Sequence, residues 1–237
     1  MPYEDFDIDS LAVYLHLTPP QVAKMADRGK LPGRKVGGRW RFSQAEIHHW
    51  LEDRIGVSAE VGLIEVEGVL QRADKDTESE AISMASLLPV EAVRFPLEAR
   101  TRNSVITSMV ELAAGTGLLW DPEKMVEAVR TRENLHPTAL DNGVALLHPR
   151  RPMPTVLAEP LLALGRTYQG IPFGGTGGGM TDVFFLVCSV DDRGHLRTLA
   201  RLSRLVGDNS FLTSVRQAET SAEIHQTLTD FENQLPA

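Results

Sequence analysis

The spacing of hydrophobic and polar positions divides the chain into three parts. Residues 1–56 carry short helical stripes and a hairpin signal. Residues 57–83 carry one weak stripe and a polar run, and residues 84–237 carry longer stripes interleaved with apolar runs. Periods near 3.6 indicate amphipathic helices, and short apolar runs indicate buried strands. We therefore predict a small, mostly helical domain, a connector and a larger α/β domain.

The N-terminal part is predicted to hold three short helices and one hairpin. Asp9-Ser10 can cap a first helix, and Thr18-Pro19-Pro20 can cap a second helix over residues 21–28. The stretch Ser43–Glu46 is a capping box for the third helix. Two short helices joined by so few residues predict a helix-turn-helix, and Gly37-Gly38 predicts a two-residue hairpin turn after it.

The connector, residues 57–83, carries an approximately helical apolar stripe and then the polar run Ala73–Glu80, which indicates a flexible linker. A stripe of this kind needs an apolar partner. A second copy of the chain is one interpretation, and a homodimer would suit paired DNA half-sites. Packing of the stripe onto its own chain is the other interpretation. The stripe consists of Val61, Ile64, Val66, Val69 and Leu70.

In the C-terminal part, helical and strand patterns alternate. Helices are predicted over residues 103–114, 121–132, 195–206 and 222–235, and strands over residues 144–147, 156–158, 161–165 and 182–190. Strands interleaved with helices are typical of an α/β domain.

The composition is that of a soluble globular protein, with 42% hydrophobic and 24% charged residues. The longest apolar run, Val183–Cys188, is too short to cross a bilayer, and the N-terminus lacks the pattern of an export signal. The one cysteine, Cys188, lies in that run and is expected to be a buried small hydrophobe. We therefore expect a cytoplasmic protein without membrane insertion.

The formal net charge is -8, but the basic residues are unevenly distributed. Residues 28–41 contain several Lys and Arg and no acidic residue. Cations on a hairpin would displace counterions from DNA phosphates, and polar groups on one helix face could reach base edges. A solvated hairpin and a protein-binding module are the alternative interpretations. The candidate DNA-binding residues are Gln21, Lys24, Arg28, Arg34, Lys35, Arg39 and Arg41.

The N-terminal part resembles the excisionase/MerR-like winged helix-turn-helix family. The resemblance covers nearly all of residues 7–53. It is carried by Leu31-Pro32, by the run Arg34–Phe42 and by the helix that ends in Trp50-Leu51. It implies a small winged helix-turn-helix domain, mostly α, with a recognition helix in the major groove and a wing against the backbone. The implied partner is DNA.

A second candidate site lies between Arg132 and His148. A helix predicted to end near Arg132 is followed by a polar loop and by the apolar run Val144–Leu147, so His148 comes directly after a strand. An imidazole in such a place is well oriented and poorly shielded, as a nucleophile or proton carrier needs to be. On spacing alone, an ordinary loop histidine is the alternative.

This stretch resembles the active-site signature of the fructose/mannitol-type enzyme IIA family of the bacterial sugar phosphotransferase system, which includes the nitrogen-regulatory IIA proteins. Arg132-Glu133, Thr138 and Gly143–Leu146 fit its pattern. Leu147 stands where the family usually has Pro, and Pro149 stands where Gly is common. The resemblance extends over about residues 84–235 and implies a mixed sheet flanked by helices.

The resemblance also implies that His148 accepts a phosphoryl group from the phosphocarrier HPr and that His195 is the second histidine of the site. Phosphoryl transfer depends on positioning and on positive charge. Arg132 could therefore offer a bidentate fork and Thr138 a hydroxyl. The alternatives are a surface ion pair for Arg132, a loop cap for Thr138 and a helix-capping role for His195.

No cofactor and no metal site are predicted. The tract Gly174–Gly179 lacks the Lys-Ser/Thr ending of a phosphate loop and is expected to be a turn. His16, His136 and His225 do not have metal-ligand spacing.

Together, these features predict a DNA-binding transcriptional regulator whose enzyme IIA-like domain senses or accepts phosphoryl groups. One alternative is a phosphocarrier of a phosphotransferase system, an enzymatic role, in which the N-terminal domain serves protein contacts. The other is a degenerate domain that acts only as a binding module, because Leu147 replaces Pro. The predicted domains are residues 1–56, 57–83 and 84–237.

Overall fold

The computed structural model describes residues 5–15, 17–44, 46–47, 50–51, 83–175 and 178–234. The chain divides into two compact units, Met1–Glu80 and Ala81–Ala237, called here the N-terminal and the C-terminal unit. The predicted connector stripe and polar linker lie outside the described residues. Both interpretations of that stripe, a homodimer and packing onto its own chain, therefore stay predictions.

Two short helices begin the N-terminal unit, α1 (Ile8–Tyr14) and α2 (Pro19–Asp27). Asp7, and not the predicted Asp9-Ser10 pair, caps α1, because its carboxylate accepts the N–H of Ser10 at 2.8 Å. The predicted cap of α2 is confirmed at Thr18. Apolar side chains between the elements form a small core that includes Leu11, Val22, Phe42 and Ile47.

The hairpin follows, with β1 (Arg34–Val36) paired antiparallel to β2 (Arg39–Arg41). Its turn residues Gly37 and Gly38 have φ of 58° and 77°, values that favour glycine and that a type I′ turn requires. Residues 44, 46–47 and 50–51 are helical, where the third helix was predicted. The unit is therefore mostly helical, with a wing-like hairpin.

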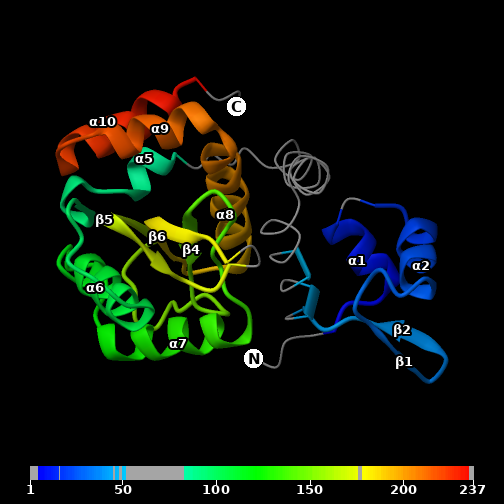
Figure 1. The fold of residues 1–237 in the computed structure, drawn as a ribbon. Helices are drawn as coiled ribbons and strands as arrows, with labels where there is room; N and C mark the ends of the chain where they lie inside the picture. Colours follow the sequence, from blue (N-terminus) through cyan, green and yellow to red (C-terminus); the bar gives the residue numbers. More distant parts are fainter. Residues whose placement is uncertain are drawn as a thin grey trace. The chain divides into compact units, whose positions relative to one another are not determined.

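A four-stranded sheet forms the centre of the C-terminal unit (Figure 1). Its strands are β3 (Val93–Arg94), β4 (Val144–Leu147), β5 (Leu161–Pro172) and β6 (Met180–Cys188), in the order β3-β5-β6-β4. β5 and β6 are antiparallel, whereas β3 pairs parallel with β5 and β4 pairs parallel with β6. The predicted mixed sheet is confirmed, and β4 is an edge strand.

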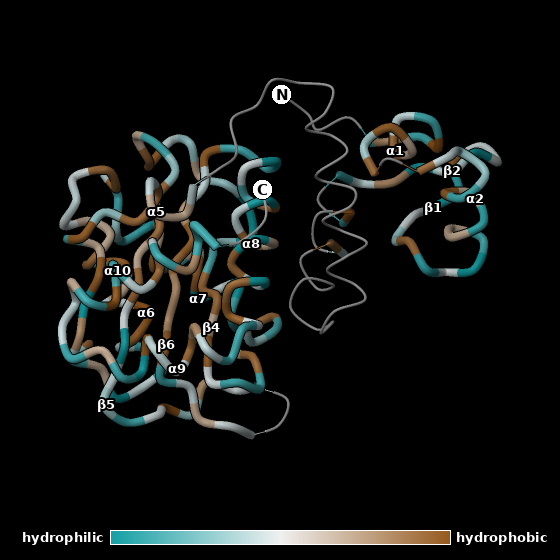
Figure 2. Tube along the Cα trace, turned by 90° about the horizontal axis from the view of Figure 1, so that it is seen from above, coloured by the Kyte–Doolittle hydropathy of each residue, from teal (hydrophilic) through white to brown (hydrophobic). Residues whose placement is uncertain are grey.

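Helices cover the sheet on both sides. α6 (Arg102–Ala114) and α7 (Pro122–Leu135) lie on one side, and α5 (Met84–Leu87), α9 (Asn209–Gln217) and α10 (Ser221–Glu232) lie on the other, while α8 (Asp192–Gly207) lies beside β4 (Figure 1). A short 3₁₀ helix (Val90–Ala92) precedes β3. Figure 2 shows apolar and polar residues alternating along α8, as in a helix with one buried face. No helix among the described residues is long and apolar enough to cross a membrane.

Two predictions on the elements are wrong, and one helix was missed. Val156–Ala158 forms a turn with a single bridge from Leu157 to Leu119 and not a strand, because the prolines around it cannot donate to a sheet ladder. β5 extends beyond residue 165 to Pro172, past an irregularity between Arg166 and Ile171. α9 was not predicted.

Candidate functional site

Two histidines from different elements lie together beside the edge of the sheet. His148 follows β4 directly, and His195 lies in the first turn of α8, whose N-cap Asp191 accepts the N–H of Gly194 at 2.8 Å. The ring centroids of His148 and His195 are 5.3 Å apart, and the ring planes are inclined by 58°. The fold therefore brings together the two histidines that the sequence analysis singled out.

His148 is better shielded than the sequence analysis expected. Its side chain is 4% exposed, because the ring turns back along β4 and lies beside His195. Its Nδ1 lies 2.7 Å from the carbonyl oxygen of Leu146. A carbonyl can only accept, so Nδ1 carries the proton, and the lone pair of the neutral ring is on Nε2. His195 is 1% exposed, and its Nδ1 lies 3.1 Å from the hydroxyl of Ser189.

The outer edge of β4 is covered by the loop that precedes it. Leu146 donates its N–H to the carbonyl of Thr138 at 3.4 Å, and Leu140 donates to the carbonyl of Val144 at 2.7 Å. Gly143 forms the turn between loop and strand with φ of 86°. The loop therefore pairs with β4 on the side that β6 leaves open.

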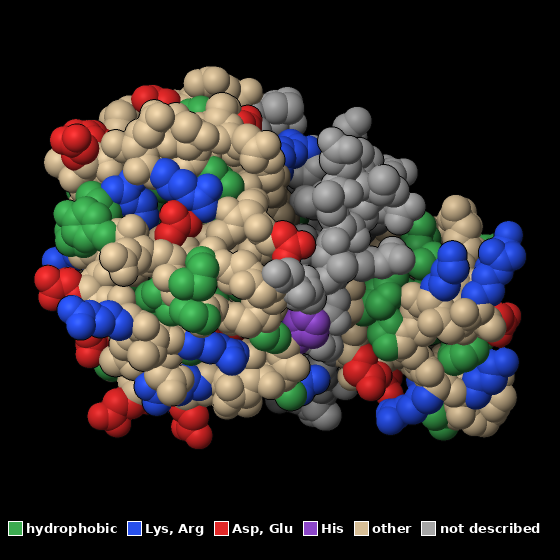
Figure 3. All heavy atoms as spheres, in the orientation of Figure 1, with side chains coloured by type: hydrophobic (Ala, Val, Ile, Leu, Met, Phe, Trp, Pro, Cys, Tyr) green, Lys and Arg blue, Asp and Glu red, His purple; other side chains and the backbone are tan. Residues whose placement is uncertain are grey.

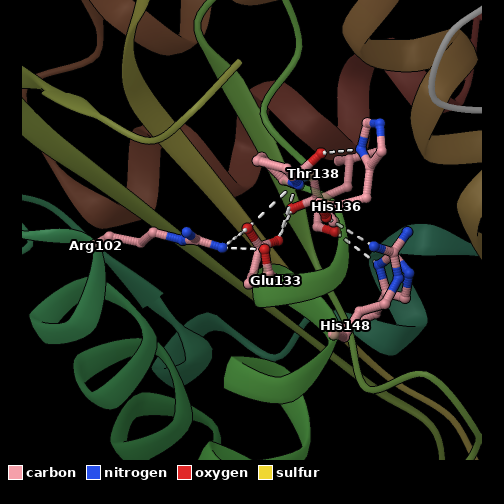
Figure 4. Close-up of polar contacts among 8 residues, drawn as sticks. Arg102, Glu133, His136, Thr138 and His148 are labelled. Atoms are coloured by element: carbon pink, nitrogen blue, oxygen red, sulfur yellow. Dashed lines mark hydrogen bonds and ion pairs between the residues drawn. The ribbon is translucent and has the colours of Figure 1, made fainter. Parts of the chain in front are cut away.

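Glu133, at the C-terminal end of α7, holds this loop in place (Figure 4). Its fully buried carboxylate accepts the main-chain N–H of Thr138 at 3.2 Å and also the Thr138 hydroxyl. Arg102, at the start of α6, donates from its Nη2 to the Glu133 carboxylate at 3.2 Å and to the Glu133 carbonyl. The Thr138 hydroxyl, predicted to serve the site directly, is thus bonded to a neighbouring side chain.

Sequence reasoning assigned no role to Glu133 or Arg102. For Glu133 the sequence contained a signal that could have indicated a role, because this residue belongs to the Arg-Glu pair at the end of α7. For Arg102 it contained none, since its partner is 31 residues further along the chain and no spacing rule joins them.

Arg132 precedes Glu133 on α7 and is 4% exposed, so the alternative of a surface ion pair does not apply. Its Nη1 donates to the main-chain carbonyl of His136 at 2.8 Å. The guanidinium therefore lies against the start of the loop that pairs with β4.

Leu147, which replaces the proline of the family pattern, lies within β4. Its side chain is fully buried, and its register partner across the sheet is Leu186 on β6. The strand thus runs in register up to the residue before His148.

The described residues contain no group of three or more His, Cys, Asp or Glu side chains that could hold a metal ion. Cys188 is a free thiol at the end of β6, and complete burial raises its pKa to about 12. Within the glycine tract, Gly174 and Gly175 lie next to Pro137 and Ala139, so this turn borders the loop before β4. Residues 176–177 of the tract lie outside the described part.

In the N-terminal unit, Lys and Arg side chains gather on the surface with a few acidic residues among them (Figure 3). Three of the predicted DNA-binding cations form ion pairs with aspartates. These pairs are Arg34 with Asp5 at 2.8 Å, Lys35 with Asp27 at 3.5 Å and Arg41 with Asp7 at 4.0 Å. Hydrogen bonds from the backbone and hydroxyl of Ser10, and then the charge of Arg41, lower the pKa of Asp7.

The other predicted DNA-binding residues lie on α2 and on the hairpin. The side-chain oxygen of Gln21 accepts the N–H and the hydroxyl of Thr18, both at 2.8 Å, as part of the α2 cap. Lys24 and Arg28 are exposed on α2 and at its C-cap, and Arg39 is exposed at the start of β2. The hairpin is anchored by Trp40, which stacks on Phe42 with a centroid distance of 5.9 Å. The arrangement offers a surface of exposed cations on a helix and a hairpin.

Comparison with family models gives two matches. Residues 86–231 match the model described as the phosphoenolpyruvate-dependent sugar phosphotransferase system, EIIA 2. Residues 6–55 match a helix-turn-helix domain model. The two matches fall in different units of the chain.

Individual relatives match the C-terminal unit. A nitrogen regulatory protein of Escherichia coli (strain K12) is 27% identical over 153 residues, which are 64% of this chain and 92% of that protein. The fructose-specific EIIABC component of Bacillus subtilis (strain 168) is 24% identical over 155 residues, which are 65% of this chain but only 23% of that protein. The chain thus spans about a quarter of the length of that EIIABC component.

Solved structures show the same fold. The nitrogen regulatory protein IIA-Ntr from Neisseria meningitidis has a TM-score of 0.52 at 21% identity and covers 62% of this chain and 99% of that one. The enzyme IIAMTL from Escherichia coli, solved in a complex with phosphorylated enzyme IIBMTL, has a TM-score of 0.52 at 18% identity and covers 61% of this chain and 99% of that one.

Proposed function

The chain belongs to the family of phosphoenolpyruvate-dependent sugar phosphotransferase system EIIA 2 domains, and on this premise we propose that it is a DNA-binding regulator whose His148 accepts a phosphoryl group. The observation that carries the proposal is the contact of His148 Nδ1 with the Leu146 carbonyl beside His195. A nucleophile needs one nitrogen with a lone pair and a fixed ring, and this contact supplies both.

The transfer step follows from the tautomer. The lone pair of His148 Nε2 forms a bond to phosphorus while the bond from phosphorus to the donor nitrogen breaks, and the donor nitrogen keeps that electron pair. The proton on Nδ1 stays on the ring and continues to bind the Leu146 carbonyl. The donor is a phosphohistidine on an HPr-like carrier protein.

The main task of the site is to stabilise the negative charge on the phosphoryl group during transfer. The transition state is loose and spreads negative charge over three oxygens, so fixed donors and cations provide most of the rate enhancement. We assign this role to Arg132 and His195. Thr138 acts indirectly, because its hydroxyl donates to Glu133.

The same chain contains a helix-turn-helix domain, so DNA binding is the process that the phosphoryl group regulates in this proposal. Phosphorylation adds close to two negative charges and three strong acceptors, and these can change an equilibrium between two states of a protein. We propose that the phosphorylated chain binds DNA with altered affinity or forms a dimer with altered affinity. Arg39, Arg28 and Lys24 are the exposed cations assigned to the DNA contact.

The experiment uses the full chain and a phosphorylated HPr-type protein. We expect one acid-labile phosphate per chain, which is absent from His148→Ala and retained in His225→Gln. A DNA duplex selected by the unmodified chain from a random library is then titrated with both forms. Phosphate retained in His148→Ala would refute the acceptor assignment, and equal affinities and oligomeric states of the two forms would refute the regulation.

A phosphocarrier function is the second candidate. One structural relative was solved with a phosphorylated enzyme IIB, and under this alternative the phosphoryl group passes from His148 to a protein of that kind. Under this alternative, the N-terminal unit serves protein contacts, and replacing Arg39 and Arg41 leaves any DNA binding unchanged. A pure binding module, caused by Leu147 in place of Pro, predicts that no phosphate is incorporated at all.

A further inference from the structure

A buried carboxylate lies close to the candidate acceptor but does not touch it. The Glu133 side chain is fully buried, and burying a charge is costly unless the charge is paired and hydrogen-bonded. Here the carboxylate is paired with the guanidinium of Arg102 and accepts hydrogen bonds from the N–H and the hydroxyl of Thr138. We name these three residues, Arg102, Glu133 and Thr138, the edge clamp.

The edge clamp continues into β4 through the main chain. Thr138 uses its N–H and hydroxyl to bind Glu133 and its carbonyl to accept the N–H of Leu146. The carbonyl of the same Leu146 bonds Nδ1 of His148 at 2.7 Å. A series of hydrogen bonds therefore runs from Arg102 on α6 to the imidazole of His148. Its first part, from Arg102 through Glu133 to Thr138, is drawn in Figure 4.

We propose that Arg102 and Glu133 are positioning residues, which hold the outer edge of β4 through Thr138 and so keep the proton of His148 on Nδ1 and its lone pair on Nε2. The proposal rests on the proposed function of His148 as the acceptor. If the loop moves away from β4, the Leu146 carbonyl is no longer fixed on the edge that faces the ring. The ring can then take the other tautomer, in which Nε2 carries the proton and cannot attack phosphorus.

The packing of α6 against α7 does not depend on the edge clamp alone. α6 and α7 already bury Met109, Met125 and Val129. A separate hydrogen bond joins the two helices from Arg130 to the hydroxyl of Thr107 at 3.0 Å. Well-packed apolar residues often replace a buried ion pair without loss of stability. A buried charge beside the loop is better explained by the orientation it imposes than by stability.

The test combines two measurements on the full chain with selectively ¹⁵N-labelled histidine. The first is the ring ¹⁵N shifts of the neutral His148 imidazole, which report the tautomer without any phosphoryl donor. The second is the rate of phosphoryl transfer as a function of the concentration of a phosphorylated HPr-type protein. The variants are Glu133→Gln and Arg102→Met, with Arg102→Lys as the conservative exchange. Arg130→Met is the matched control, because it also removes an arginine that joins α6 and α7.

We expect Glu133→Gln and Arg102→Met to raise the fraction of the Nε2–H tautomer and to lower the maximal transfer rate by about tenfold or more, because small misplacements of reacting groups are costly. The donor concentration for half-maximal rate should change by less than about twofold, since neither side chain contacts the donor. Arg102→Lys should recover part of the rate, and Arg130→Met should match the wild type in both measurements.

A wild-type tautomer and a wild-type rate in Glu133→Gln would overturn the proposal. So would equal losses in Arg102→Met and Arg130→Met, because they would indicate only a loosened helix pair. If Arg102→Met does not fold, Glu133→Gln decides, because it removes the fully buried charge and leaves only Arg102, which is 29% exposed, without its carboxylate partner. If the wild type accepts no phosphoryl group, the proposed function fails, whereas the ring shifts still decide whether the edge clamp sets the tautomer.

Discussion

The imidazole rings of His148 and His195 lie 5.3 Å apart, centroid to centroid, although the residues are separated by two strands of the sheet. One ring follows the edge strand β4 and the other begins α8, which comes directly after β6. Because β4 and β6 are parallel neighbours, their carboxyl ends meet at the same edge of the sheet. The topology therefore places the two imidazole rings side by side, although their residues lie far apart in the sequence.

Exchange of His195 tests the role of the second ring. In His195→Gln we expect the transfer rate to His148 to fall by about a hundredfold, the loss usual when one donor to a transition-state charge is removed. Stopped-flow or quenched transfer from a phosphorylated HPr-type protein measures it. His225→Gln, on α10, serves as the control and should retain the wild-type rate. An unchanged rate in His195→Gln would exclude this ring from the transfer step.

Gly143→Ala should destabilise the C-terminal unit by about 2–3 kcal/mol, because the residue has positive φ and an added Cβ meets its surroundings. That Cβ would lie 2.6 Å from Nη2 of Arg216 and 3.3 Å from the carbonyl of Met180. Denaturant unfolding of the variant measures the loss. Gly207→Ala, in open space at the end of α8, is the control and should be neutral or slightly stabilising.

Cys188 should not react with a thiol reagent such as DTNB at pH 8 while the chain is folded. Burial raises the pKa of this thiol to about 12, so it stays protonated and shielded. The pKa is higher than the value of about 8.5 in the unfolded chain, so its contribution to stability is present below pH 8.5 and is lost as the pH rises towards 12. In Cys188→Ala this pH dependence should disappear. Rapid labelling of the native protein would contradict the burial.

Arg39→Ala should weaken DNA binding about equally for all sequences and reduce the slope of log K against log salt by about one, as expected for one lost phosphate contact. The exposed Arg39 is on the hairpin of the N-terminal unit. Fluorescence anisotropy with a random-sequence duplex at several salt concentrations measures the slope. Arg94→Ala, on β3 of the C-terminal unit, is the control. A slope unchanged from the wild type would remove Arg39 from the interface.

Much of the fold was predictable because local signals agree with the tertiary structure. Thr18 caps α2, the Gly37-Gly38 pair makes the hairpin turn, and the apolar run Val144–Leu147 is β4. α9 was missed because its N-cap, Asp208, is also the C-cap of α8, so the helical pattern of α9 follows that of α8 without a linker.

The candidate site was predictable as far as its residues belong to the motifs of the resemblance, which are the stretch from Arg132 to His148 and the second histidine, His195. The stretch from Arg132 to His148 carries its own pattern, so the sequence identified both residues. The burial of His148 follows from the packing of α8 beside β4, which no local pattern encodes. The contact of Arg102 with Glu133 depends on the packing of α6 against α7, so it could not be inferred from the sequence either.

The most direct measurement of the central claim is a ¹⁵N–³¹P correlation spectrum of the full chain, labelled with ¹⁵N-histidine and treated with a phosphorylated HPr-type protein. We expect a single phosphorus coupled to Nε2 of His148, with the proton still on Nδ1 opposite the Leu146 carbonyl. Phosphorus on Nδ1, on another histidine or on no histidine of the folded chain would contradict it.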